Sequence, residues 1–197
     1  MPQPKHVMAL PAPTDAKLAR TLDAGMKKYF DICREKLGFL PNVLRAYAFR
    51  PAKLKNFVAT HNELMLGESK LTRLEREMVA VVVSSANHCY YCLVAHGQAV
   101  RKLSGDPELG EMLVANYRVA ELPARQRAML DFAHKLTLSP STVDDADRAG
   151  LRKAGLGDAE IFDLVDTIGF FNMSNRVAIG LDMIPNRQYH VQDRGTA

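Results

Sequence analysis

The sequence predicts an all-α protein, a single-domain helical bundle. Apolar residues recur at intervals of three and four along almost the whole chain, which is the pattern of amphipathic helices. Alternating or β-branched segments typical of strands are nearly absent. The chain has 197 residues, of which 47% are hydrophobic and 24% are charged, so it can bury one globular core.

The first 13 residues differ from the rest of the chain. They include prolines at positions 2, 4, 11 and 13, and they lack the uninterrupted apolar segment of a signal peptide. We therefore expect residues 1–13 to form an extended N-terminal arm and residues 14–197 to form the helical domain.

The helices of this domain follow from the periodicity and from the residues that interrupt it. The apolar stripe that begins at Leu18, Leu22 and Met26 predicts a long first helix. Glycine is typical of the position just after a helix end, and this pattern occurs at Gly38, Gly67 and Gly155. The expected helices span residues 14–37, 42–49, 51–66, 72–86, 89–103, 107–116, 123–138, 146–155 and 158–180.

Residues 78–83 (MVAVVV) are the one segment with the composition of a strand. They follow Thr72 and Glu75, which have the spacing of a capping box at a helix start. The segment is therefore interpreted as a buried helix.

A weak internal similarity favours a duplicated helical hairpin. Residues 71–78 (LTRLEREM) and 122–129 (LPARQRAM) share Leu, Arg and Met at equivalent positions, and a second expected helix follows each of them.

Charge and hydropathy exclude several classes of protein. The net charge is +4, but the basic residues occur as scattered pairs, so nucleic-acid binding is not indicated. No apolar segment approaches the roughly 18 residues that a membrane-spanning helix needs. Without an export signal, and with only three cysteines, we expect a cytoplasmic protein without a disulfide scaffold.

The segment with the clearest chemistry is Cys89-x-x-Cys92-x-x-x-His96. On a helix these three residues share one face, and the two cysteine Cα atoms are about 5 Å apart, within the roughly 4.4–6.8 Å that a disulfide tolerates. Asn87 is the expected N-cap, so the dipole of the helix should lower the pKa of both thiols, and more strongly that of Cys89. His96 lies one turn from Cys92 on the same helix.

Glu77 is expected to face His96. If the chain reverses between Ala86 and Asn87, antiparallel helices pair residues whose numbers sum to about 173, and Glu77 lies opposite His96. A carboxylate in this place could hold the imidazole and exchange a proton with it. The four residues together favour redox chemistry.

Two other interpretations remain open for the cysteines. They could be buried small hydrophobic residues. They could also bind zinc with His96, and His88 or Glu77 would then be the fourth ligand. Outside this segment, structural roles are favoured for a set of polar residues, namely Cys33, His61, His134, Asn172, Asn175 and Arg176.

The spacing of Glu77, Cys89, Cys92 and His96 resembles the active-site signature of the AhpD-like, carboxymuconolactone decarboxylase superfamily, in its alkylhydroperoxidase-related (peroxidase-related) branch. The resemblance extends from PNVLRAYAFRP, at residues 41–51, to FFNMSNR, at residues 170–176. It implies an all-helical homo-oligomer that reduces alkyl hydroperoxides or hydrogen peroxide. It implies a dithiol reductant of the lipoamide or thioredoxin type and no metal, haem or other cofactor.

The resemblance also implies roles for individual residues. Cys92 would attack the peroxide, Cys89 would resolve the sulfenic acid as a disulfide, and Glu77 with His96 would relay the proton. The dipole of the helix, taken alone, favours the opposite order of the two sulfurs.

Two departures from the family pattern bear on function. Members with peroxidase activity carry a histidine between the cysteines, where this chain has Tyr91, and here a histidine instead precedes the motif, at His88. Tyr91 could donate a hydrogen bond to the peroxide, but a phenol with a pKa near 10 is a poor proton shuttle, so slow turnover is expected. The decarboxylase branch generally lacks the cysteine pair, which argues against lactone decarboxylation.

We therefore expect a thiol-dependent peroxidase, an alkyl hydroperoxide reductase. Two alternatives remain: a disulfide-exchange adaptor for a separate peroxidase, and a module that binds zinc or a small ligand. The many amphipathic helices also predict a homo-oligomer, because subunit contacts would cover the apolar stripes that a single chain leaves exposed.

Overall fold

The structure, a computed structural model, describes residues 5–194 and confirms the all-α expectation. Within that range it has ten α-helices, three 3₁₀ turns and no strand. The α-helices are α1 (Asp15–Thr21), α2 (Ala24–Leu37), α3 (Asn42–Tyr47), α4 (Pro51–Leu66), α5 (Arg73–Ala86), α6 (Tyr90–Ser104), α7 (Pro107–Asn116), α8 (Ala124–Leu138), α9 (Asp145–Lys153) and α10 (Asp158–Gly180). The 3₁₀ turns are η1 (Tyr117–Val119), η2 (Pro140–Thr142) and η3 (Arg187–His190).

The prediction of one long helix over residues 14–37 is wrong. The chain leaves the helical conformation at Leu22, and Asp23 starts α2 by accepting a hydrogen bond from the Met26 amide at 2.8 Å. Leu18 and Leu22 are both buried, so the apolar stripe continues across the break. Periodicity alone therefore does not reveal the interruption.

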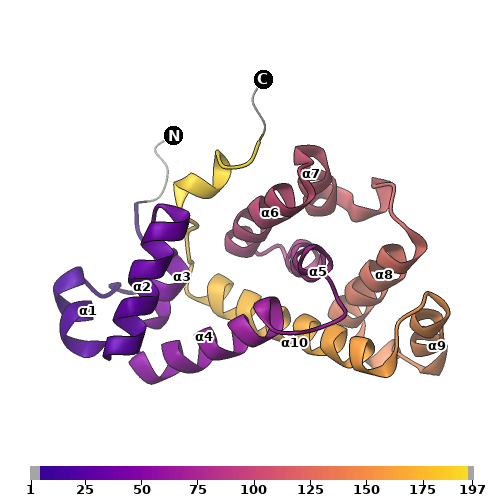
Figure 1. Cartoon of the computed structure of the whole chain (residues 1–197), viewed down its shortest axis with the longest axis horizontal. Helices are drawn as coiled ribbons and strands as arrows, with labels where there is room; N and C mark the ends of the chain where they lie inside the picture. The colour runs from indigo at the N-terminus through magenta and orange to yellow at the C-terminus, as the bar shows by residue number, and fades with distance from the viewer. Residues whose placement is uncertain (1–4, 195–197) are drawn as a thin grey trace.

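Helix α5 lies at the centre of the bundle. Figure 1 shows it nearly end-on, with α4, α6, α8 and α10 around it. Its residues Met78–Val83 are almost completely buried, so the interpretation of this segment as a buried helix is confirmed. The helix begins with the expected capping box, in which the Glu75 amide donates to Thr72 Oγ1 at 3.1 Å and the Thr72 amide donates to Glu75 Oε2 at 2.8 Å.

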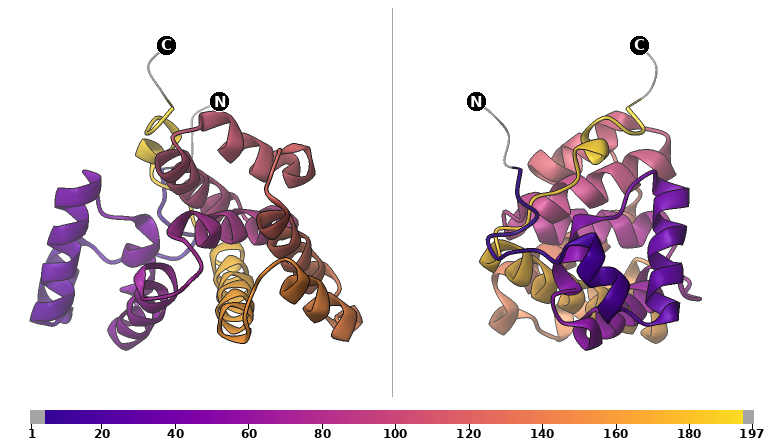
Figure 2. Two further views of the ribbon diagram at one scale, coloured as in Figure 1. Left: turned by 45° about the vertical axis from the view of Figure 1, so that its right-hand side comes forward. Right: turned by 90° about the vertical axis from the view of Figure 1, so that its left-hand side faces the viewer.

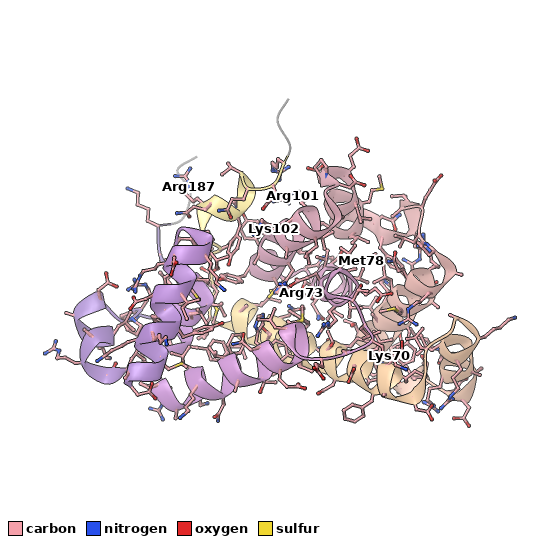
Figure 3. All side chains as sticks on the ribbon, viewed as in Figure 1. Lys70, Arg73, Met78, Arg101, Lys102 and Arg187 are labelled. Atoms are coloured by element: carbon pink, nitrogen blue, oxygen red, sulfur yellow. The ribbon has the colours of Figure 1, made fainter. Side chains whose placement is uncertain are left out.

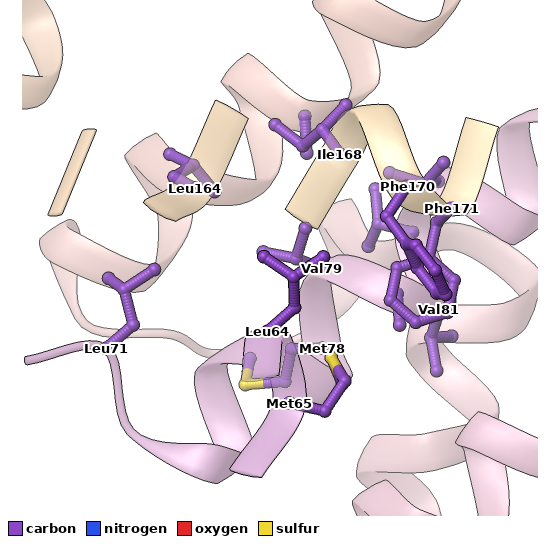
Figure 4. Packing of buried hydrophobic residues seen from close by; sticks show 14 of the residues in the cluster. Leu64, Met65, Leu71, Met78, Val79, Val81, Leu164, Ile168, Phe170 and Phe171 are labelled. Carbon is purple, nitrogen blue, oxygen red and sulfur yellow. The ribbon is translucent and has the colours of Figure 1, made fainter. Parts of the chain in front are cut away.

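The main core joins α5 to its neighbours. Figure 4 shows side chains of α4, α5 and α10 packed together, with Leu64 and Met65 from the first, Val79 from the second and Ile168 and Phe171 from the third. Burial of such side chains contributes about 1.5–3 kcal/mol each. This packing sets the position of α5 relative to α10, on which the site described below depends.

The two ends of the described chain close over one side of the bundle. The Ala9 amide donates to the Leu181 carbonyl at 2.7 Å, and the Ile184 amide donates to the Val7 carbonyl at 3.1 Å. On α6, the buried Arg101 donates to the carbonyl of Tyr189 at 2.8 Å; Figure 3 labels this arginine below the C-terminal segment. Residues 1–4 of the expected arm lie outside the described residues.

The helices form an elongated arrangement. The views of Figure 2 place α1 and α2 at one end and α8 and α9 at the other. None of the helices described is long and apolar enough to cross a lipid bilayer. The predicted internal duplication of a helical hairpin stays a prediction.

Candidate active site

Helices α5 and α6 form an antiparallel hairpin that brings Glu77 to His96. The Oε2 atom of Glu77 lies 2.6 Å from Nδ1 of His96. The His96 side chain is 16% exposed and the Glu77 side chain 12% exposed, so little water competes for this contact. The pairing expected from residue numbers is therefore present, and the carboxylate fixes the imidazole by one ring nitrogen.

The turn between the two helices differs from the expectation. Asn87 is the C-cap of α5, and Cys89 rather than Asn87 is the N-cap of α6. His88 adopts the left-handed conformation with φ of 55°, and the Cys89 amide donates to the Ser84 carbonyl at 2.9 Å. Because His88 reverses the chain, α6 begins after Cys89.

Two asparagines of α10, the half-buried Asn172 and the buried Asn175, hold this turn in place. The Asn87 Nδ2 atom donates to Oδ1 of Asn172 at 3.1 Å and to Oδ1 of Asn175 at 3.0 Å. Asn175 in turn donates to Oγ of Ser84 at 3.0 Å, and its side chain has no exposure to solvent. The structural role favoured for these asparagines is thus explained by their bonds to the turn that carries the cysteines.

Both cysteines of the motif are buried, and no disulfide joins them. Cys89 is 1% exposed and Cys92 is 3% exposed. They belong to a small apolar cluster with residues of the N-terminal arm, α3, α6, α10 and the segment after α10, namely Met8, Ala46, Tyr91, Ala178 and Met183.

The two cysteines differ in the pKa of their thiols. A hydrogen bond from Cys92 lowers the pKa of Cys89 to about 7, against the opposing effect of burial. The first amides of α6 and the charge of His96 lower this pKa further, although no amide makes a well-formed cap hydrogen bond to the sulfur. The same hydrogen bond, together with burial, raises the pKa of Cys92 well above its ordinary value. The negative charge of the pair therefore lies on Cys89.

Tyr91 and His88 lie on either side of Cys89 in different surroundings. The Val43 amide donates to the Tyr91 hydroxyl at 2.9 Å, and burial raises the pKa of Tyr91 well above its ordinary value. Tyr91 therefore ties α6 to α3 and cannot shuttle a proton at neutral pH. His88 is exposed on the turn. Neither residue lines the pocket described next.

A pocket of about 540 Å³ lies beside the cysteine cluster. It is lined mostly by apolar side chains of α3, α4, α10 and the two terminal segments. Ala46, Tyr47 and Met183 belong both to the pocket wall and to the surroundings of the cysteines. Burial raises the pKa of Tyr47 to about 12, and a charge on Cys92 adds to the effect. These shared side chains place the pocket next to the cysteine cluster.

One residue near this site was not predicted from the sequence. His61 of α4, expected to be structural, brings its ring to 6.5 Å from the His96 ring and 6.1 Å from the Phe170 ring, measured between centroids. Burial lowers the pKa of His61, and the charge of His96 lowers it further. No local pattern marks this histidine, because its position depends on how α4 packs against α10.

The donor groups do not form a metal site. Among residues 5–194, no group of three or more His, Cys, Asp or Glu side chains is arranged to hold a metal ion. The Nδ1 atom of His96 is already bound by Glu77. The geometry therefore gives no support to the zinc interpretation.

Comparison with known proteins identifies the family. The sequence profile of the carboxymuconolactone decarboxylase family matches residues 51–135. The structure of an uncharacterized peroxidase-related protein from Silicibacter sp. TM1040 is 58% identical, with a TM-score of 0.91, over 98% of this chain and 100% of that chain. A second structure, described as an alkylhydroperoxidase AhpD core and an uncharacterized peroxidase-related protein from Ralstonia eutropha JMP134, is 36% identical, with a TM-score of 0.92, over the same shares.

The chain therefore belongs to the AhpD-like, carboxymuconolactone decarboxylase superfamily, as the resemblance implied. The debrominase Bmp8, solved in complex with 2,3,4-tribromopyrrole, shares the fold at 16% identity and a TM-score of 0.76, over 93% of this chain and 92% of its own. No curated protein matches this chain. The relatives at higher identity support a general peroxidase-related role.

Proposed function

We propose that the protein is a cytoplasmic, thiol-dependent peroxidase that reduces alkyl hydroperoxides or hydrogen peroxide through Cys89 and Cys92. The observation that carries the proposal is the α5–α6 hairpin, which brings Glu77 to 2.6 Å from His96 on the helix that begins at the buried Cys89–Cys92 pair; the lowered pKa of Cys89 supports it. A thiolate is the nucleophile that attacks a peroxide, and at neutral pH about half of this site would hold one.

The proposed reaction has two steps. The thiolate attacks the outer oxygen of ROOH, the O–O bond breaks, and the leaving alkoxide takes a proton to become ROH while the sulfur becomes a sulfenic acid. The second thiol then displaces hydroxide from the sulfenic acid and supplies the proton that turns it into water, leaving a Cys89–Cys92 disulfide. A dithiol reductant restores both thiols and is itself oxidised to a disulfide.

The electrostatics favour Cys89 as the attacking sulfur and Cys92 as the resolving one. This order is the reverse of the one that the resemblance implies, and it follows first from the hydrogen bond that Cys92 donates to Cys89 and then from the amides at the start of α6. Glu77 and His96 are proposed to supply the proton that the leaving alkoxide needs, because they form an acid–base pair on the same helical hairpin as the sulfurs.

Burial of both sulfurs favours direct peroxide reduction over the adaptor alternative. An adaptor must present a sulfur to the disulfide of another protein, whereas Cys89 and Cys92 are 1% and 3% exposed. A small hydroperoxide can reach such a site more easily than a protein disulfide can. For the same reason the lipoamide-type reductant is favoured over the thioredoxin type.

Steady-state peroxide consumption tests the proposal. We expect turnover of cumene hydroperoxide with reduced lipoamide, and slower turnover with reduced thioredoxin. A Cys89→Ser, Cys92→Ser double variant provides the blank. The proposal fails if the wild-type protein consumes no more peroxide than this blank, or if only a separate added peroxidase allows consumption.

We also propose that the protein is a homo-oligomer in which a second copy covers α10. Phe162 and Val165 lie one turn apart on this helix and are exposed, Phe162 by 70%. Light scattering after size exclusion tests this proposal: Phe162→Glu should reduce the mass to that of one chain, and an unchanged mass would contradict it.

A further inference from the structure

The pocket beside the dithiol has the features of a site for a molecule with one charged end. We infer that it binds a single-chain carboxylic acid, with the carboxylate at the edge formed by α4 and the hydrocarbon chain inside. The further statement that a hydroperoxide of such an acid is a substrate rests on the proposed function.

The interior of the pocket suits a hydrocarbon chain. Its volume of about 540 Å³ lies within the roughly 300–1,000 Å³ typical of small-molecule sites. Flexible and aromatic apolar side chains from separate parts of the chain form most of the lining, including Met8, Phe57, Phe170, Met173 and Met183. Methionine adapts to chains of variable shape, so this lining favours an alkyl chain over one rigid ring.

The edge of the pocket is positively charged. Arg50 and Lys53 line it, and both are exposed. Within the part of the chain that the structure describes, neither side chain pairs with a carboxylate, whereas the nearby Arg45 lies 2.7 Å from Asp15. Arg50 is also the N-cap of α4 and makes no side-chain cap hydrogen bond, so the positive end of the helix dipole lies at the same edge. An anionic head group complements this charge.

Part of the pocket wall also packs in the cysteine cluster. Ala46 and Met183 line the pocket and pack in the same apolar cluster as Cys89 and Cys92. An acid held by its head at Arg50 would therefore extend its chain toward the dithiol. A hydroperoxide group on that chain would be reduced by the two-step reaction above to the hydroxy acid, with water and the Cys89–Cys92 disulfide as the other products.

Calorimetric titration with octanoate, decanoate and laurate tests the binding site. We expect the affinity to increase roughly threefold to fourfold per added methylene, and decanoate to bind more tightly than 1-decanol. The Arg50→Gln, Lys53→Gln double variant should weaken decanoate binding roughly tenfold, as expected for lost bonds to a charged group. The matched control, Lys27→Gln with Lys28→Gln, removes the same charge from α2 and should leave the affinity unchanged.

The inference is overturned if the acids do not bind, if decanoate and 1-decanol bind equally, if affinity is independent of chain length, or if the control weakens binding as much as the pocket variant. A second copy that seals the pocket would give the first of these results. Because the titrated acids carry no peroxide, binding without peroxidase activity would overturn the proposed function alone. Peroxidase activity without binding would overturn the pocket alone.

Discussion

Across the α5–α6 hairpin, Oε2 of Glu77 lies 2.6 Å from Nδ1 of His96, on the helix that has Cys89 as its N-cap and Cys92 in its first turn. The contact joins a residue before the turn to one after it. The orientation of the imidazole relative to the dithiol therefore depends on the turn, on the packing of α5 and on the carboxylate itself.

Glu77→Gln should lower peroxide consumption on the order of 100-fold. The amide preserves the shape of the side chain but removes the charge that fixes the ring and accepts its proton, and general acid–base groups contribute about 10²–10⁴-fold to rates. Initial rates over a range of pH measure the effect, and the pH optimum should shift. The exposed Glu63→Gln is the control. An unchanged rate and profile would remove Glu77 from the mechanism.

The dithiol should titrate near pH 7. The pKa of Cys89 is lowered to about 7, so thiolate absorbance at 240 nm, and the rate of reaction with peroxide, should rise as the pH increases through 7. Burial raises the pKa of Cys33, so that thiol should not contribute there. Cys92→Ala should move the titration to higher pH, because the hydrogen bond from Cys92 is the largest cause of the lowering. A midpoint that stays near 7 in this variant would contradict the role of this hydrogen bond.

The two single cysteine variants should differ in sulfenic acid formation. Cys92→Ser keeps the attacking sulfur without its resolving partner, so one equivalent of hydroperoxide should leave a sulfenic acid on Cys89 that dimedone labels. Cys89→Ser should give little label. The opposite pattern, detected by mass spectrometry, would restore the order that the resemblance implies.

Asn175→Ala should destabilise the protein by about 1–3 kcal/mol. The substitution leaves the buried Ser84 hydroxyl without the amide that bonds to it and removes one of the two acceptors of Asn87, and an unsatisfied buried group costs about that much. Urea unfolding measures the change. The exposed Asn56→Ala should change the free energy of unfolding by no more than about 0.5 kcal/mol. Equal effects of the two variants would show that the turn does not depend on Asn175.

The contact between Glu77 and His96 could be predicted because it is local. Once the chain reverses near Ala86, helical geometry fixes which residues face each other within the next few turns. Buried α5 could be predicted for the same reason, since the capping box and the apolar run lie within one segment.

Features that depend on packing between distant segments could not be predicted. His61 reaches the site, and the pocket has its shape, only because α3 and α4 pack against α10. The helix break at Leu22 and the position of Cys89 as N-cap depend on single residues, Asp23 and His88, whose conformations the periodicity does not determine.

The most direct test of the account is a single-turnover reaction of the reduced protein with one equivalent of cumene hydroperoxide, followed by stopped flow and thiol titration. If the proposed reaction is correct, we expect rapid loss of two of the three thiols, a Cys89–Cys92 disulfide in the peptide map and an unreacted Cys33. Two results would contradict this expectation. All three thiols could remain while the hydroperoxide stays unreacted, or Cys33 could be oxidised in place of the Cys89–Cys92 pair.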